Sequence, residues 1–275
     1  MQGTVTGVAA GLLLLGALLV PLERLFPALP GRPLRRPGLR PDLFYWFFTP
    51  LLTRAVTRGA LIAAVVLLAL MAGMPPDATH VRSLLDAPGA LVRRQPAWLQ
   101  ALEVVVIGDF IGYWIHRAFH RGRLWRFHAI HHSSTDLDWL SSVRLHPVND
   151  VVMRLAQALP VLLLGFSPTV LAAYVPFLAF YAILLHANVP WTFGPLRKVI
   201  ASPTFHRWHH TSEEEGLDKN FAGLFPVWDL LFGTFYLPEG RQPGRFGLKE
   251  AEVAEGLAAQ LLGPFRRQAR VTIAS

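Results

Sequence analysis

The stretch Asp109–His132, DFIGYWIHRAFHRGRLWRFHAIHH, decides how this chain folds. It continues directly from an apolar segment and holds five histidines within seventeen residues. Asp109, His116 and His120 are spaced seven and four residues apart, so a helix places all three on one face. We therefore expect the first histidine pair to lie at the end of a membrane helix that begins near Trp98.

A second histidine motif lies about eighty residues downstream, where the pattern of His128–His132 (HAIHH) recurs at His206–His210 (HRWHH). Residues at i, i+3 and i+4 share one helix face, so each motif offers up to three imidazoles to one region of space. Neutral imidazole is a common metal ligand. Three histidine groups exceed the needs of one zinc ion and suit two metals with open coordination positions, which predicts a dinuclear site. The residues concerned are His116, His120, His128, His131, His132, His206, His209 and His210.

Three histidines lie outside these groups. His186 ends an apolar segment, and we expect it to return to the site as a further ligand. His146, in RLHPVND, is either a ligand, a helix cap or a hydrogen-bond partner of a ligand. His80 stands alone in a loop and is expected to face solvent. A second interpretation stays open, in which the histidines form a polar or pH-sensitive patch beside the membrane.

Several carboxylate and amide side chains are candidates to orient the imidazoles through hydrogen bonds. They are Asp109, Asp136, Asp138, Asn188, Asn220 and Asp229. Of these, we expect Asp109, Asn188 and Asn220 to act in catalysis beside the metal ligands. Asp109 lies within an apolar span, where a carboxylate is costly and needs a partner.

The composition is that of an integral membrane protein, because 52% of the 275 residues are hydrophobic and only 16% are charged. Several apolar segments approach the length of a bilayer-spanning helix. They are residues 4–22, 59–74, 98–116 and 151–189. Pro160 and a turn signal at 165–168 break the last segment and predict a helical hairpin. The aromatic segment 42–57 is expected at the membrane interface.

The net charge of +8 comes from arginines beside apolar segments, notably in the Pro- and Arg-rich segment 27–41. This distribution is typical of cytoplasmic flanks that meet anionic lipid headgroups, and it argues against nucleic acid as a partner. With the N-terminus outside, segment 27–41 and every histidine group face the cytoplasm. The chain has no cysteine, which excludes disulfides, thiolate ligands and cysteine-bound iron–sulfur clusters.

These observations predict an all-helical membrane bundle with four to five spans, or with a re-entrant hairpin. A cytosolic helical cap would carry the dimetal site. We expect residues 1–97 to form N-terminal spans and a basic interfacial linker. Residues 98–240 would form the catalytic domain, and residues 241–275 a cytosolic tail.

Four motifs carry a resemblance to a known family. His116–His120 (HRAFH), His128–His132, His206–His210 and the segment DKNFAGLFPVWDLLFGTFY at 218–236 resemble the fatty acid hydroxylase and sterol desaturase superfamily of membrane-bound di-iron oxygenases. The resemblance covers about residues 100–240. It implies two iron ions held by the histidines of the three motifs, and O2 as co-substrate. It also implies hydroxylation or desaturation of an unactivated C–H bond in a lipid.

One branch of this family has a further H-x-x-x-H motif before the last histidine group. This chain reads HANVP at 186–190, so only His186 is present there. Water, Asn188 or His146 would complete the ligand set. Electrons would come from a separate redox partner, because the sequence holds no flavin fingerprint, haem domain or cysteine cluster.

Other functions stay open at the level of sequence. A zinc-dependent membrane hydrolase would use the histidines as ligands and Asp109 or Glu213 as a base. A non-enzymatic metal-binding membrane protein would need no substrate. Among oxygenase substrates, a sterol, a fatty acyl chain, an alkyl ether lipid, an ornithine-type lipid and a carotenoid are all compatible with the motifs.

Overall fold

Long apolar helices dominate the computed structural model, which describes residues 2–71, 73–75, 77, 79–80, 91–248 and 256–266. Four of the helices are long and apolar enough to cross a bilayer. They are α1 (Gln2–Leu25), α2 (Leu39–Met71), α4 (Ala97–Phe119) and α7 (Pro168–His186). The described residues form helices and one isolated β-bridge, between Thr211 and Phe246. The prediction of an all-helical, multi-pass membrane protein is therefore confirmed.

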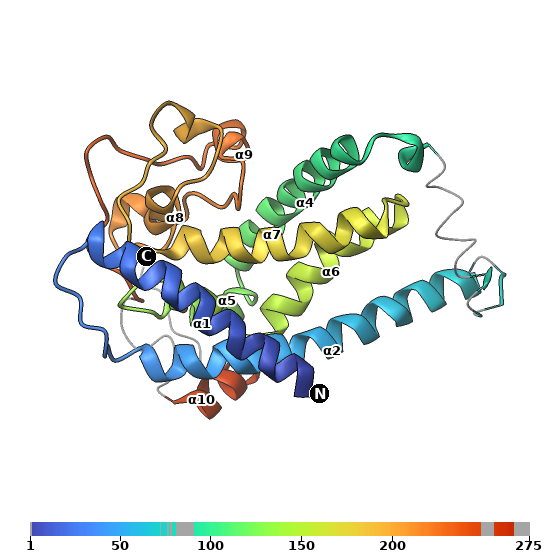
Figure 1. Ribbon diagram of the computed structural model, residues 1–275, viewed down its shortest axis with the longest axis horizontal. Helices are drawn as coiled ribbons and strands as arrows, with labels where there is room; N and C mark the ends of the chain where they lie inside the picture. Colours follow the sequence, from blue (N-terminus) through green and yellow to red (C-terminus); the bar gives the residue numbers. More distant parts are fainter. Residues whose placement is uncertain are drawn as a thin grey trace.

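The long helices converge at one end of the molecule (Figure 1). There α2, α4, α7 and the shorter α6 (Pro147–Leu163) meet α5 (Trp125–His132) and α8 (Pro203–His209), and towards the opposite end they spread apart. We call the convergent end the histidine end, because α5 and α8 carry the two H-x-x-H-H motifs. Helix α1 packs on α2, where the Trp46 indole Nε1 donates a hydrogen bond to the Val8 carbonyl at 3.0 Å.

Helix α2 corrects the predicted division between an interfacial segment at 42–57 and a span at 59–74. Both segments belong to one continuous helix of 33 residues. At about 1.5 Å per residue such a helix is about 50 Å long, whereas the hydrocarbon core of a bilayer is about 30 Å thick. One helix therefore has room for both an aromatic interfacial turn and a span. Pro50 lies inside the helix without ending it.

Helices α6 and α7 form the predicted hairpin. The turn signal at 165–168 lies at their junction, and Gly165 adopts a left-handed φ of 77° that favours glycine. Pro160 was expected to break the segment, but it stays within the last turn of α6. The hairpin brings His186, the last residue of α7, back to the histidine end, as the sequence predicts.

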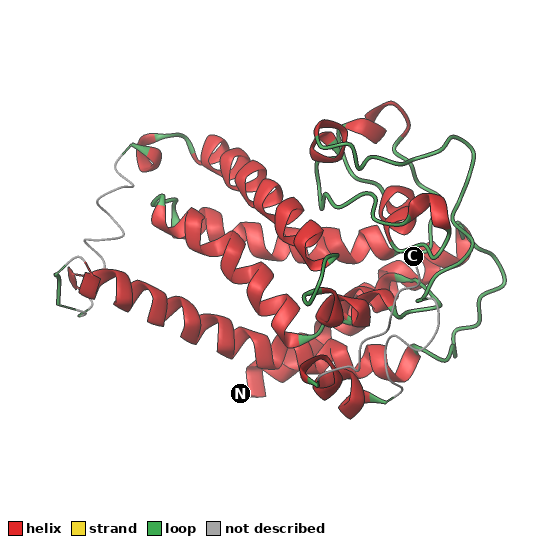
Figure 2. Ribbon diagram, turned by 180° about the vertical axis from the view of Figure 1, so that it is seen from behind, coloured by secondary structure: helices red, strands yellow, loops and turns green. Residues whose placement is uncertain are grey.

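Short helices and loops cap the histidine end (Figure 2). These short elements are η3 (Trp139–Val143), η4 (Gly194–Lys198), η5 (Glu214–Gly216), α9 (Val227–Leu231), α10 (Leu257–Leu262) and η6 (Gly263–Phe265). The remaining short helix, η2 (Val92–Arg94), precedes α4. The aromatic core of the cap contains Tyr113, Phe205, Trp208 and Phe221, so it joins α4 to α8. This core fixes the end of a membrane helix against the second histidine motif.

A buried ion network joins the start of α2 to the segment between α5 and α6. One carboxylate oxygen of Asp42 accepts a hydrogen bond from Arg144 Nε at 2.6 Å. The other oxygen lies 2.6 Å from Arg36 Nη2. Arg36 also makes a two-pronged contact with Asp138, with both distances at 2.6 Å. Asp42, Arg36 and Arg144 are almost fully buried, so each charge depends on its partners.

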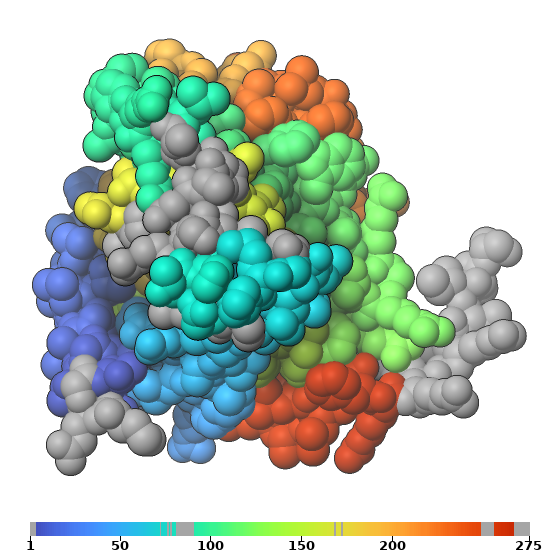
Figure 3. Space-filling model, turned by 90° about the vertical axis from the view of Figure 1, so that its right-hand side faces the viewer, coloured from blue at the N-terminus to red at the C-terminus, as the bar shows by residue number. Residues whose placement is uncertain are grey.

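The C-terminal segment with α10 lies against α2 and α6, as the red atoms beside the blue and green ones show in Figure 3. The Tyr45 hydroxyl donates to Gln260 Oε1 at 3.1 Å, and His146 Nε2 lies 3.0 Å from the Leu261 carbonyl oxygen. Part of the predicted tail, residues 249–255 and 267–275, lies outside the described residues, as does the 81–90 part of the loop expected between spans.

Replacing Asp42 tests the ion network. We expect Asp42→Asn to destabilise the folded protein by about 3 kcal/mol, because two buried guanidinium groups lose their shared carboxylate. Thermal unfolding of the purified protein in detergent measures this effect as a lower midpoint. Asp150→Asn is the matched control, since its pair with Arg154 is partly exposed and contributes less than about 1 kcal/mol. Equal midpoints for the two variants would contradict the structural role of the network.

Candidate metal centre

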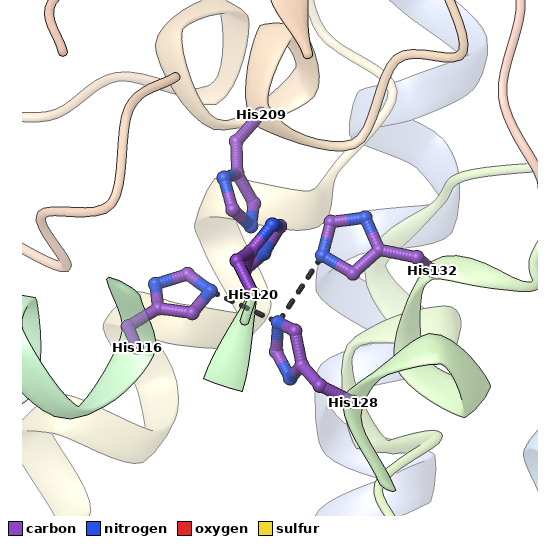
Figure 4. Close-up of side chains that lie close together, drawn as sticks. All are labelled: His116, His120, His128, His132 and His209. Atoms are coloured by element: carbon purple, nitrogen blue, oxygen red, sulfur yellow. Dashed lines mark hydrogen bonds between the residues drawn. The ribbon is translucent and has the colours of Figure 1, made fainter. Parts of the chain in front are cut away.

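Nine histidines gather at the histidine end in two groups. We call them group A and group B, and within each group the candidate ligand nitrogens lie within 4.8 Å of one another. Figure 4 shows group A, whose five rings point into one common space. Group A contains His116, His120, His128, His132 and His209. Group B contains His131, His186, His206 and His210.

Each H-x-x-H-H motif contributes to both groups, and the two motifs do so in opposite ways. On α5, the first and last histidines of the motif belong to group A and the middle one, His131, belongs to group B. On α8 and its C-cap, the first and last belong to group B and the middle one, His209, to group A. The rings of His132 and His210, one from each group, stack with centroids 4.3 Å apart. The two groups are therefore neighbours within one composite site.

Burial keeps these imidazoles neutral. Desolvation first, and neighbouring imidazoles second, lower the pKa well below the usual value for the histidines of α5 and of the α8 motif. Burial also lowers the pKa of His120, against a weaker opposing effect of Asp218. Near neutral pH each of these rings therefore carries a lone pair on one nitrogen.

The lone pairs of two group B rings face each other. His186 Nδ1 lies 2.7 Å from the Ala182 carbonyl oxygen, and His131 Nδ1 lies 3.3 Å from the Arg144 carbonyl oxygen. A carbonyl oxygen only accepts, so both Nδ1 atoms are protonated and both Nε2 atoms are not. These two Nε2 atoms are only 3.2 Å apart. No proton is available between them, and a cation that accepts both lone pairs resolves the contact.

Group A shows the same chemistry. His116 Nδ1 and His209 Nδ1 each lie 2.8 Å from a backbone carbonyl oxygen, that of Phe221 and that of Lys219. His116 Nε2 then faces His128 Nε2 at 3.1 Å. The Nε2 atoms of His120 and His209 are buried without a hydrogen-bond partner. Imidazole donors suit Fe, Zn, Cu and Ni, so the residues fit two first-row transition-metal ions.

The groups that orient the rings are not those the sequence suggested. The carbonyls of Ala182, Phe221, Arg144 and Lys219 do most of this work. Two side chains that sequence reasoning missed complete the set, because Asn149 Oδ1 lies 2.8 Å from His128 Nδ1 and Asp218 Oδ1 lies 3.0 Å from His120 Nδ1. Asp218 opens the DKN motif, which is the signal that could have found it. None of the six predicted orienting residues, all within the described part of the chain, contacts an imidazole.

Asp109 instead supports the segment that faces group A. Its carboxylate accepts the backbone N–H groups of Leu224 and Phe225 at 2.8 Å and the Trp228 indole N–H at 3.0 Å. The prediction that this buried carboxylate needs a partner is confirmed, but it does not point to the histidines. Asp109 is therefore a positioning residue.

Asp229 and Asn220 act on the same segment. Asp229 accepts the N–H groups of Phe221 and Ala222. The Asn220 amide donates to the Phe205 and Tyr236 carbonyls. This places the Phe221 carbonyl against His116, so Asn220 is also a positioning residue.

Of the alternatives left open for His146, the structure shows the helix cap, and it places Asn188 away from the imidazoles. His146 lies outside both groups because its Nδ1 accepts the Val148 N–H as the N-cap of α6, while its Nε2 contacts Leu261. Both ring nitrogens are used, so no lone pair remains for a metal. Asn188 exchanges hydrogen bonds with the backbone of Leu29 and ties the end of α7 to the loop after α1.

Part of this chain is similar in sequence to known proteins. The model of the fatty acid hydroxylase family matches residues 101–234. The ornithine lipid hydroxylase OlsE of Rhizobium tropici is 35% identical over 180 residues, which cover 64% of this chain and 54% of that protein. Human alkylglycerol monooxygenase is 36% identical over 128 residues, which cover 46% of this chain and 28% of that enzyme.

A rice very-long-chain aldehyde decarbonylase, GL1-6, is 33% identical over 139 residues, which cover 46% of this chain and 21% of that protein. The match thus spans about half of the length of the ornithine lipid hydroxylase and less than a third of the other two. No solved structure matches this chain.

Metal quantitation tests the two groups. We expect His186→Ala to lower the metal content from about two ions per chain towards one, since group B loses one of its four nitrogens and the apolar alanine leaves a gap in the ligand set. Elemental analysis of the purified protein measures the content. His146→Asn is the control, because asparagine is also a good N-cap and the metal content should not change. A full metal complement in His186→Ala would remove His186 from the ligand set.

Proposed function

We propose that this chain, whose residues 101–234 match the fatty acid hydroxylase family, is a membrane-bound di-iron oxygenase of that superfamily and that it hydroxylates a lipid. The observation that carries this proposal is the pair of buried, all-imidazole groups at the ends of the membrane helices α4 and α7. The nine histidines of groups A and B would hold the two irons. Residues 98–240 would form the catalytic domain.

The bound irons would supply the redox chemistry that activates O2. Hydroxylation of a C–H bond by O2 consumes two electrons and two protons and yields an alcohol and water. Desaturation of the same substrate is the variant outcome. The chain itself contributes a dry, rigid site, because the nitrogens are buried and most rings are fixed through Nδ1 by a carbonyl, an amide or a carboxylate.

The substrate class follows from position and from relatives. The site lies at the ends of apolar helices, so an alkyl chain can approach from the bilayer. The similar proteins are named for ornithine lipid and alkylglycerol substrates, and we propose a lipid with a polar headgroup and an alkyl chain. The basic segment 27–41 and the arginines at 117–126 share the histidine end, and this charge distribution supports the proposal that the histidine end faces the cytoplasm.

The two carboxylates named as bases for the hydrolase alternative, Asp109 and Glu213, are engaged by N–H donors. The Asp109 carboxylate is occupied by three N–H donors. Glu213 Oε1 accepts the backbone N–H groups of Gly244 and Arg245. The five nitrogens of group A also exceed the tetrahedral set of a single zinc ion. These contacts support an oxygenase.

Electrons would enter beside His120. A small cavity of about 60 Å³ adjoins this ring and is lined by Arg117, Arg121 and Asp218, among others. Four arginines lie within residues 117–126, and no acidic residue occurs from 110 to 135. Such a basic surface next to a metal ligand fits an acidic electron-carrier protein, whose approach the charges accelerate.

Metal replacement and oxygen removal test the oxygenase proposal. Purified protein loaded with iron should hydroxylate an alkyl lipid only when O2 and a reductant are present. Zinc-loaded protein should be inactive, because zinc has no redox chemistry. Incorporation of ¹⁸O from labelled O2 into the product, followed by mass spectrometry, is the measurement. Turnover by the zinc form without oxygen would instead establish the hydrolase.

Charge reversal tests the electron entry surface. We expect Arg121→Glu together with Arg123→Glu to slow reduction by an acidic carrier about tenfold or more at low salt. Reduction by dithionite should stay unchanged, because this small reductant does not need the surface. Lys198→Glu, an exposed cation on η4, is the matched control. Equal rates for carrier-driven reduction in all three proteins would locate the entry point elsewhere.

A further inference from the structure

A cavity separate from the metal centre lies where α1 ends and α2 begins. Its volume is about 180 Å³. The lining comes from the end of α1, the loop between α1 and α2, the start of η3, and Asn188 after α7. Neither histidine group lines it. The oxygenase proposal leaves this cavity without a role.

The polar side of the cavity offers both a hydrogen-bond acceptor and cations. Glu23 Oε1 accepts the backbone N–H groups of Trp139 and Asn188, at 3.0 and 2.8 Å. Its second oxygen, Oε2, has no hydrogen bond to any residue in the described part of the chain. Glu23 lines the cavity, so this oxygen can accept from a ligand that carries N–H groups.

Two of the arginines that line the cavity have no carboxylate partner among the described residues. Arg24 makes no hydrogen bond or ion pair with them, and Arg32 uses one nitrogen to contact the Leu137 carbonyl. The third, Arg36, is paired with Asp42 and Asp138 but keeps a buried Nη1 without a hydrogen-bond partner. The cavity thus presents two unpaired positive charges beside one free carboxyl oxygen.

The apolar side of the cavity and its surroundings fit a lipid. Val20, Leu34, Leu39 and Leu140 line it together with the polar residues. Leu25, Phe26 and Leu34 expose 72%, 54% and 63% of their surface around the same loop. Leu25 ends a helix able to span the bilayer, and Phe26 follows it directly. Charged arginine side chains next to exposed apolar side chains, at the end of a membrane helix, are typical of the membrane interface.

We propose that this cavity binds the headgroup of a zwitterionic lipid. The ammonium group donates to Glu23 Oε2, and the phosphate or carboxylate of the same headgroup binds Arg24 and Arg32. The alkyl chains follow the apolar surface of α1. A purely anionic headgroup leaves Glu23 unused, and a quaternary ammonium has no N–H to donate. The site therefore selects a primary ammonium beside an anion. This inference concerns binding and stands independently of the oxygenase proposal.

Lipid binding to the metal-loaded protein tests the proposal. Native mass spectrometry from detergent compares dioleoyl phosphatidylethanolamine, phosphatidylglycerol and phosphatidylcholine at equal concentrations. We expect the ethanolamine lipid to bind about tenfold more tightly than the other two, the difference that one charge-assisted hydrogen bond makes. Equal binding of all three lipids would overturn the proposal, and so would preference for the glycerol lipid, which would indicate a merely basic interface.

Substitutions of cavity residues test whether the headgroup binds in this cavity. Glu23→Gln keeps an oxygen for the Trp139 and Asn188 N–H groups, and it should abolish the preference for the ethanolamine lipid. Arg24→Gln removes the charge of an exposed side chain that has no partner among the described residues. It should weaken the binding of the ethanolamine lipid and of the glycerol lipid alike, by about threefold to tenfold. Arg35→Gln makes the same charge change in the same loop, outside the cavity, and should change nothing. A preference that survives Glu23→Gln, with unfolding midpoints equal to the parent, would place the headgroup elsewhere.

Discussion

The structure depends on a cluster of nine imidazoles, of which seven belong to buried residues and several bring their Nε2 atoms face to face. His131 and His186 illustrate the constraint, because each proton is committed to a backbone carbonyl and the two bare nitrogens meet at 3.2 Å. In the absence of a cation such contacts cost free energy, since buried acceptors without donors are unfavourable. Metal binding and formation of the cap are therefore parts of one equilibrium.

Backbone carbonyl oxygens, more than side chains, hold the imidazole rings in these orientations. Four carbonyls from three separate segments fix the rings, and buried carboxylates hold two of those segments in turn. Asp229 ties down the N–H groups of Phe221 and Ala222, while Asp42 holds the Arg144 side chain, whose own carbonyl meets His131. Asp229 and Asp42 thus position the segments whose carbonyls contact the rings, and they do not contact the rings themselves. Their negative charges stay outside the histidine groups, which keeps the ligand set entirely neutral.

Spacing in the sequence was enough to predict that these histidines come together, but not how they divide into two groups. Periods of three, four and seven residues place the histidines on helix faces, and the apolar segments predict four long helices and the return of His186. The assignment of His131 and His209 to opposite groups depends on how α5 and α8 meet in space, which no local pattern contains. Carbonyl partners carry no sequence signal at all. His146 is a case where local chemistry was available, because a following proline at the first helical position is typical of an N-cap.

The exchange of ligands between the motifs has a consequence for how the centre assembles. Helix α5 contributes to both groups, and so does the α8 motif, so an ion in either group restricts both helices. The second ion would then enter a site whose chain entropy has already been lost, and we expect it to bind more tightly than the first. The division of each motif between the two groups therefore predicts cooperative loading.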